Sequence, residues 1–158
     1  MFDYGFPGTV PVVGDWDGNQ TDTVGLYYPV TAQWLLRNQN TPGAPDLAFA
    51  YGFGGVQPVV GDWNGDKTDT VGIYHAATGT WYLRNAAGGG PAALVFNYGY
   101  PGTAPLAGDW DGDGTDGVGL YDRTTGRLLL RNAASSGAPD VNTAIQGRTG
   151  AQPLVWRP

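Results

Sequence analysis

The segment Gly14-Asp-Trp-Asp-Gly-Asn-Gln-Thr-Asp-Thr-Val-Gly-Leu-Tyr27 returns twice in this chain of 158 residues, as residues 61–74 and 108–121. Each step is 47 residues, and residues 4–50 and 51–97 are identical at 25 of 47 positions without a gap. A period of this length indicates one supersecondary unit that is repeated along the chain. The sequence therefore predicts a single repeat domain over 1–158, with units at about 4–50, 51–97 and 98–144 and a partial fourth unit at 145–158.

Each unit carries the pattern of four short strands. In the first unit, apolar runs bounded by turn residues fall at 11–14, 23–27, 33–37 and 47–51. The 27 Gly and 12 Pro make up about a quarter of the chain, and no segment has a helical period. We therefore predict an all-β fold with four strands in each 47-residue unit.

Four strands in 47 residues fit a β-propeller blade, because propeller repeats run from about 40 to 50 residues. A β-trefoil, which is built from three four-stranded units, is the alternative. The fourth unit favours blades, since a trefoil closes with three units. With one inserted residue, that unit aligns Gly147, Pro153, Leu154 and Val155 with Gly99, Pro105, Leu106 and Ala107.

Ten of the 14 Asp residues fall in the loop between the first and second strands of the units. Loop positions are counted from Asp15, Asp62 and Asp109 as position 1. Oxygen-bearing side chains at positions 1, 3, 5 and 8 of one tight loop offer the hard ligands that Ca²⁺ takes, and a bound dication relieves the repulsion between their charges. The predicted ligands are Asp15, Asp17, Asn19 and Asp22 in the first loop, Asp62, Asn64, Asp66 and Asp69 in the second, and Asp109, Asp111, Asp113 and Asp116 in the third.

A purely structural role is the alternative for these loops, since Asp, Asn and Gly are good turn formers. Three such loops in register favour metal binding in at least one. The third loop is expected to bind most tightly. It carries four Asp, and Gly114 at position 6 adopts a left-handed backbone conformation without strain, where the other loops have Gln20 and Lys67.

The repeated motif Gly-Asp-Trp-Asp/Asn-Gly-x-x-Thr-Asp, then Val-Gly-Leu/Ile-Tyr, resembles the FG-GAP and VCBS class of calcium-binding β-propeller repeats. Trp81-Tyr-Leu-Arg-Asn85 is similar to a bacterial variant. The resemblance covers nearly the whole chain. It implies a propeller with calcium in the loop between the first two strands of a blade, in a secreted or cell-surface protein where such repeats stand beside hydrolase or adhesion domains. From this we predict a module for extracellular binding, adhesion or assembly. The last acid stands at position 8 rather than the family's usual 9, and three repeats are too few to close a ring alone.

Composition narrows the function further. The net charge of −6 argues against a nucleic-acid partner, and the absence of Cys with only one His removes thiolate zinc sites and His-based triads. No apolar run is long enough to insert into a membrane, and no signal peptide begins the given chain. Because every candidate site is repeated and no unique acid pair stands out, we predict a protein that is not an enzyme.

Two further side-chain types recur. Repeated Trp residues are expected to pack between neighbouring units, although exposed aromatics would suit a carbohydrate-binding lectin, the alternative function. Arg37, Arg84 and Arg131 are expected to pair with carboxylates of the Asp-rich loops. Because three units leave open sheet edges, we predict closure through a homo-oligomer, with a dimer favoured, and a protein or glycan ligand is possible.

Overall fold

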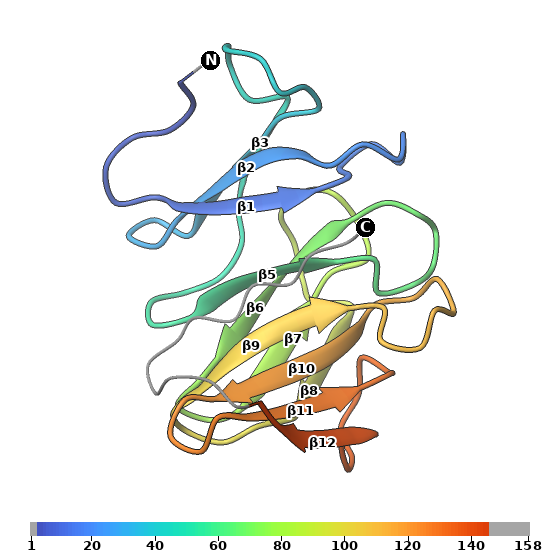
Figure 1. Cartoon of the computed structure of the whole chain (residues 1–158). Coiled ribbons are helices and arrows are strands. Elements are labelled where there is room, and N and C mark those ends of the chain that lie inside the picture. Colours follow the sequence, from blue (N-terminus) through green and yellow to red (C-terminus); the bar gives the residue numbers. More distant parts are fainter. Residues whose placement is uncertain (1–2, 146–158) are drawn as a thin grey trace.

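The computed structural model describes residues 3–145, in which every regular element is a β-strand (Figure 1). The twelve strands form three four-stranded sheets. The first sheet holds β1 (Val10–Gly14), β2 (Thr23–Tyr28), β3 (Gln33–Leu36) and β4 (Leu47–Ala50). The second holds β5 (Gln57–Gly61), β6 (Thr70–His75), β7 (Thr80–Leu83) and β8 (Leu94–Asn97). The third holds β9 (Thr103–Gly108), β10 (Gly117–Asp122), β11 (Arg127–Arg131) and β12 (Val141–Ala144).

The prediction of an all-β fold with four strands in each unit is confirmed, and the strand bounds of the first unit differ by one residue at most. Each sheet is an antiparallel meander whose strands follow one another in chain order. A β-trefoil joins its units in a shared barrel, whereas every strand pairing among residues 3–145 stays within one unit. The topology is that of three separate four-stranded sheets. The partial fourth unit lies outside the described residues, apart from its first residue.

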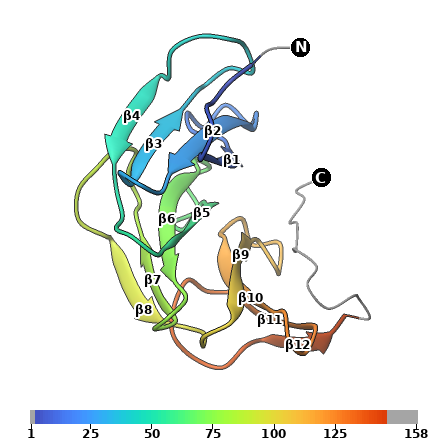
Figure 2. The same cartoon turned by 90° about the vertical axis from the view of Figure 1, so that its left-hand side faces the viewer.

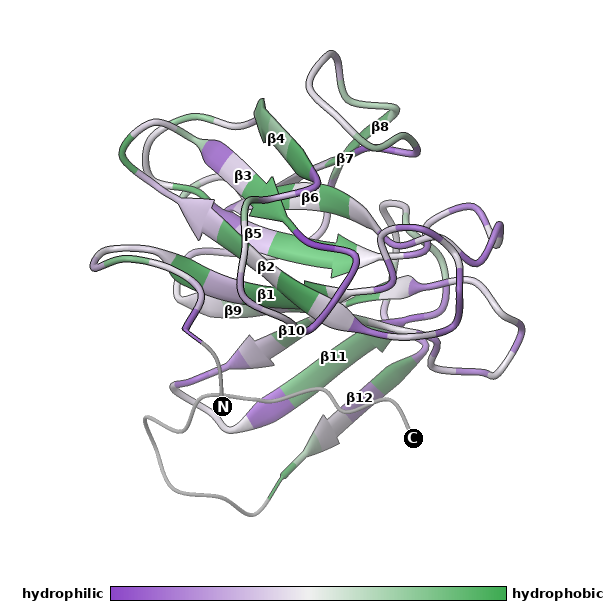
Figure 3. Ribbon diagram, turned by 90° about the horizontal axis from the view of Figure 1, so that it is seen from above, coloured by the Kyte–Doolittle hydropathy of each residue, from purple (hydrophilic) through white to green (hydrophobic). Residues whose placement is uncertain are grey.

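The three sheets follow one another along an arc (Figure 2). The first strands of the sheets, β1, β5 and β9, lie on the inner side of the arc, and β5 contacts both β1 and β9. Figure 3 shows that hydrophobic residues are concentrated in the strands and that hydrophilic residues gather in connecting loops. The described part of the chain thus forms three consecutive sheets in an open arc.

Apolar side chains fill the space between successive sheets. Trp16, Trp34 and Leu36 of the first unit form one buried cluster with Val71 and Ile73 of the second. The same arrangement recurs at the next junction, where the cluster contains Trp63, Trp81, Leu83, Val118 and Leu120. Trp34 and Trp81 are completely buried, so the prediction that the repeated Trp residues pack between units is confirmed. Burial of such large side chains is the main stabilising term at each junction.

The prediction that the repeated Arg residues pair with loop carboxylates is wrong. Each guanidinium instead donates to backbone carbonyls of the loop that follows its strand. The acceptors for Nη1 are Ala44 O for Arg37, Pro91 O for Arg84 and, at 2.8 Å, Ala138 O for Arg131. The reason is geometric, because this loop folds back over the strand end and presents several carbonyls to a planar fork of donors.

Candidate metal loops

The Asp-rich loops are closed by the carboxylate at position 1. In the third loop, Asp109 Oδ1 accepts hydrogen bonds from Gly112 N at 2.8 Å and Asp113 N at 3.1 Å, and its Oδ2 accepts one from Gly114 N at 2.9 Å. Asp15 and Asp62 accept the corresponding bonds in the other two loops. The Gly114 N–H contributes most to holding the pKa of Asp109 below its usual value. Position 1 therefore shapes each loop through the backbone.

Position 6 has the predicted left-handed backbone in all three loops. The φ angles are 67° at Gln20, 69° at Lys67 and 88° at Gly114. A residue with a β-carbon is strained in this region, whereas glycine is not. The third loop therefore reaches the shared loop conformation with the least strain at this position.

Carboxylates at positions 1, 3 and 5 come together in the third loop. Single carboxylate oxygens of Asp109, Asp111 and Asp113 all lie within 4.8 Å of one another, and the three residues are exposed. Among residues 3–145, this is the one such group of three or more His, Cys, Asp or Glu side chains. The arrangement offers oxygen ligands alone, which suits a hard cation.

In the second loop, the side chains at positions 3 and 5 are hydrogen-bonded to each other. Asn64 Nδ2 donates to Asp66 Oδ2 at 2.9 Å, and Thr68 N donates to Asp66 Oδ1 at 2.9 Å. The bond from Asn64 is the leading cause that lowers the pKa of Asp66. Position 3 here is an amide that already holds the carboxylate at position 5, so an internal contact satisfies the two side chains.

The acid at position 8 contacts the preceding unit. Asp69 Oδ2 accepts a hydrogen bond from Asp15 N at 2.9 Å, and Asp116 Oδ2 accepts one from Asp62 N at 2.8 Å. Asp69 and Asp116 are 4% and 2% exposed, whereas Asp22, which has no preceding unit, is exposed. Of the four predicted ligand positions, the structure thus gathers the first three in the third loop and directs the fourth across the junction.

One signal in the sequence distinguishes position 8. Positions 1 and 8 are Asp in every unit, whereas positions 3 and 5 alternate between Asp and Asn. Calcium accepts either side chain as an oxygen ligand, so strict Asp at two positions points to an additional requirement. At position 1 that requirement is closure of the loop by the carboxylate, and at position 8 it is the contact between units.

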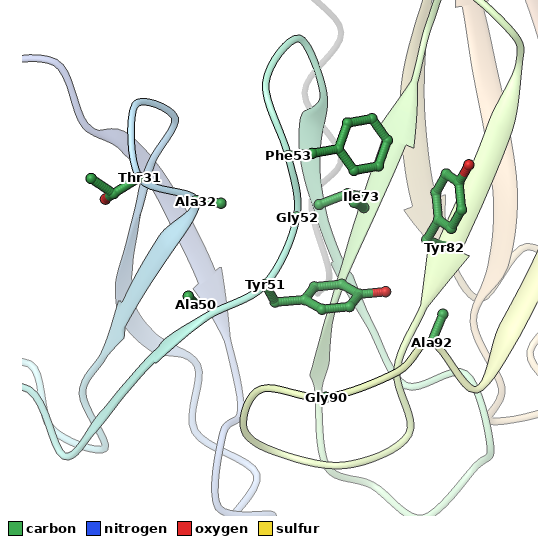
Figure 4. A pocket seen from close by; sticks show the side chains of 10 residues that line it. All are labelled: Thr31, Ala32, Ala50, Tyr51, Gly52, Phe53, Ile73, Tyr82, Gly90 and Ala92. Carbon is green, nitrogen blue, oxygen red and sulfur yellow. The ribbon is translucent and has the colours of Figure 1, made fainter.

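A pocket of about 460 Å³ between the first and second sheets was not predicted (Figure 4). The rings of Tyr51, Phe53 and Tyr82 lie around it, and the remaining lining is mostly Ala and Gly. Burial raises the pKa of Tyr51 to about 12, so its hydroxyl stays protonated at neutral pH. The described residues that line it include no carboxylate, His, Lys or Arg. Tyr82 is Leu35 and Leu129 in the other units, so comparison of the repeats singles out this junction.

Asp122 has partners that its position in a turn did not reveal. Its Oδ2 accepts hydrogen bonds from Thr125 Oγ1 at 2.7 Å and from Tyr100 Oη at 2.8 Å. These bonds, led by that from Thr125, lower the pKa of Asp122 to about 2. The residue therefore secures the turn after β10 to the loop before β9.

Comparison with known proteins gives no family assignment, since no protein-family model matches the chain and no curated protein is significantly similar to it. Over residues 3–145, the structure has no helix with the length and apolar character needed to cross a membrane.

Proposed function

We propose that this chain is a non-catalytic, calcium-binding β-propeller-type repeat module that acts in binding or assembly at the cell surface or in the extracellular space. The group formed by Asp109, Asp111 and Asp113 is the observation that carries the calcium part of the proposal. The assembly part rests on the open arc of three sheets. The extracellular setting follows the resemblance to secreted repeat proteins.

The chemistry of the third loop favours a divalent cation with a preference for oxygen. Three exposed carboxylates held within a few ångströms repel one another, and a bound cation removes that repulsion. Asp109 already accepts hydrogen bonds from three backbone N–H groups, which fix the orientation of its carboxylate beside those of Asp111 and Asp113. A flexible set of carboxylates and waters fits Ca²⁺ better than Mg²⁺, which demands near-ideal octahedral geometry.

The third loop is proposed as the tightest of the three sites. The Asn64–Asp66 contact occupies both side chains in the second loop, and the positive charge of Lys67 opposes a cation there. The first loop offers the amide of Asn19 at position 5 in place of a carboxylate. Fewer charged ligands mean weaker calcium binding.

Calorimetric titration with Ca²⁺ and with Mg²⁺, paired with thermal melts in calcium and in EDTA, tests the proposal. A site with a Kd of about 10 μM adds roughly 2.7 kcal/mol of stability at about 1 mM free Ca²⁺. Asp111→Asn should remove most of this gain, whereas the matched change Asp17→Asn in the first loop should remove little. If the wild-type protein melts at the same temperature in calcium and in EDTA, the calcium proposal is wrong.

A carbohydrate-binding lectin remains the second candidate, because a pocket lined by aromatic rings lies between the first and second sheets (Figure 4). Its volume lies in the range of small-ligand sites, and the rings of Tyr51, Phe53 and Tyr82 offer apolar faces on which a sugar ring can stack. A glycan array with wild type and Phe53→Ala tests this function. Specific hits that disappear in the variant support the lectin, and an array without hits rejects it.

A further inference from the structure

Both junctions between units are built from the same polar contacts. The carboxylate of the Asp at position 8 of the later unit accepts a hydrogen bond from the backbone N–H at position 1 of the earlier unit. The backbone N–H of the same Asp donates a second hydrogen bond to the backbone carbonyl at position 1. The return bonds are Asp69 N to Asp15 O at 2.8 Å and Asp116 N to Asp62 O at 2.7 Å. Each junction therefore carries a two-way hydrogen-bonded pair at the Asp-rich end.

A second contact lies beside this pair. A β-carbon at Gly18 would lie 2.9 Å from Thr68 Oγ1, and one at Gly65 would lie 3.1 Å from Thr115 Oγ1. The glycine at position 4 of one loop is thus covered by the threonine at position 7 of the next. At Gly112, the corresponding glycine of the third unit, no atom of residues 3–145 lies within 4 Å of such a β-carbon. Within the described part of the chain, the third loop thus has no neighbour of the kind that covers the other two loops.

The first and third units each leave exposed a surface whose equivalent is buried in the two junctions between units. Asp22 and Thr21 are exposed on the first unit, and Asp109 is exposed on the third, although Asp15 and Asp62 are only 7% and 6% exposed. Val13 is 57% exposed, whereas its equivalents Val60 and Ala107 pack against the inter-sheet clusters. On the third unit, Trp110, Leu128 and Leu130 are only partly buried, unlike the fully enclosed side chains at the same positions of the earlier units.

We propose that the first unit of a second copy of this chain docks on the third unit, through a joint of the same kind as the two internal junctions. In this joint, Asp22 of one copy accepts from the backbone N–H of Asp109 of the other, and Val13 faces Trp110 and Leu128. The proposal deepens the assembly part of the proposed function and rests on it, and its tests measure association rather than calcium binding. The contact is heterologous, so two copies related by a two-fold axis form two identical joints.

A second copy fits these faces because the internal junctions already join the same surfaces. The first two units are identical at 25 of 47 positions, so the first unit of another copy presents to the third unit nearly what the second presents to the first. The competing occupant within the chain is 146–158, which aligns with the start of a fourth unit and lies outside the described residues. If that segment covers the third unit instead, Thr21 of another copy does not reach Gly112.

Paired cysteines test the joint directly, because the natural chain has no Cys. Thr21→Cys with Gly112→Cys places one thiol on each side of it. Under mild oxidation, we expect disulfide-linked species of more than one chain on a non-reducing gel. Gly18→Cys with Thr68→Cys is the positive control and should form its disulfide within one chain. Thr21→Cys with Gly102→Cys is the negative control, since Gly102 also has a positive φ and open space around it.

Self-association of single variants gives a second, independent readout by sedimentation over a range of concentrations. Val13→Glu should weaken association about tenfold or more, because it places an unpaired charge in an apolar contact. Val95→Glu is the matched control and should have no effect, since Val95 is 58% exposed on the outer strand β8. A double variant Thr21→Cys with Gly112→Cys that stays monomeric under oxidation, or equal association of both Glu variants, overturns the joint. Calcium titration of Val13→Glu should match wild type, so failure of calcium binding and failure of the joint are separable.

Discussion

Asp69 accepts a hydrogen bond from the backbone N–H of Asp15, 54 positions earlier, and returns one through its own N–H to the Asp15 carbonyl. The two residues belong to different units and both are buried. A buried carboxylate aimed at a backbone N–H of a neighbouring sheet fixes how that sheet is placed. The same pair recurs with Asp116 and Asp62, which makes it the repeating polar link of the arc.

Removal of this carboxylate should destabilise the fold. Asp69→Ala deletes a charge-assisted hydrogen bond and leaves the buried N–H of Asp15 without its acceptor, which costs about 2–3 kcal/mol. Asp46→Ala is the control. Asp46 Oδ2 accepts from Asn38 N at the same kind of distance, 2.8 Å, but in an exposed position. Urea unfolding should show a smaller loss for Asp46→Ala, and equal losses would mean that Asp69 does not link the units.

Substitutions by glycine at position 6 of the loops are expected to increase stability rather than reduce it. Gln20→Gly and Lys67→Gly should each stabilise the protein by up to about 1 kcal/mol, because glycine removes the strain of a left-handed residue with a β-carbon. Gly114→Ala should destabilise by a similar amount, since its surroundings are open and only the backbone conformation opposes the change. Thermal melts in EDTA isolate this effect from calcium. A loss of stability on Gln20→Gly would contradict the argument.

Local pattern was sufficient to predict the strands and the inter-sheet Trp residues. Alternation such as Val24-Gly-Leu-Tyr27 determines which side chains face a neighbouring sheet, and the repeat shows that the same face recurs. The left-handed backbone at position 6 was likewise predictable, because Gly114 marks a conformation that the two related loops must share. These features depend on residues close together in the chain, where sequence patterns are informative.

Contacts between distant residues were not predictable in the same way. Asp69 was predicted as a ligand of its own loop because the two are adjacent in sequence, whereas its carboxylate contacts Asp15 in another sheet. From its charge, Arg84 is expected to pair with a carboxylate. Its guanidinium instead donates hydrogen bonds to backbone carbonyls of the loop that follows β7. The charge of a side chain indicates which groups it can bind, but the three-dimensional structure determines which of those groups lies close enough.

The turn held by Asp122 should make stability depend on pH in the acidic range. An ordinary Asp carboxyl titrates near pH ~3.9, whereas the pKa of Asp122 in the folded protein is about 2. A pKa that is lower in the folded state stabilises the fold above about pH 4, and this contribution is lost as the pH falls from about 4 toward 2. Asp122→Asn should therefore show a smaller drop in Tm over that range than wild type.

A direct measurement supports or contradicts this assignment. Thr125→Val removes the hydroxyl that contributes most to the shift, so the pKa of Asp122 should rise toward the ordinary value. Carbon-13 NMR titration of the Asp122 carboxyl follows the change at that residue alone. An unchanged titration in the variant would show that the hydrogen bond from Thr125 does not set the pKa.

The proposed joint, together with the number of units, predicts the size of the assembly. Propellers commonly close with about four to eight blades, and each chain supplies three complete sheets. Two copies joined head to tail make a ring of six sheets and leave no sheet face open, which removes the exposed apolar surface around Val13 and Leu128. Light scattering should therefore give twice the chain mass of 16.6 kDa, without larger species as the concentration rises. A mass that grows continuously with concentration would indicate that the joint propagates as an open chain because the angle between sheets does not close at six.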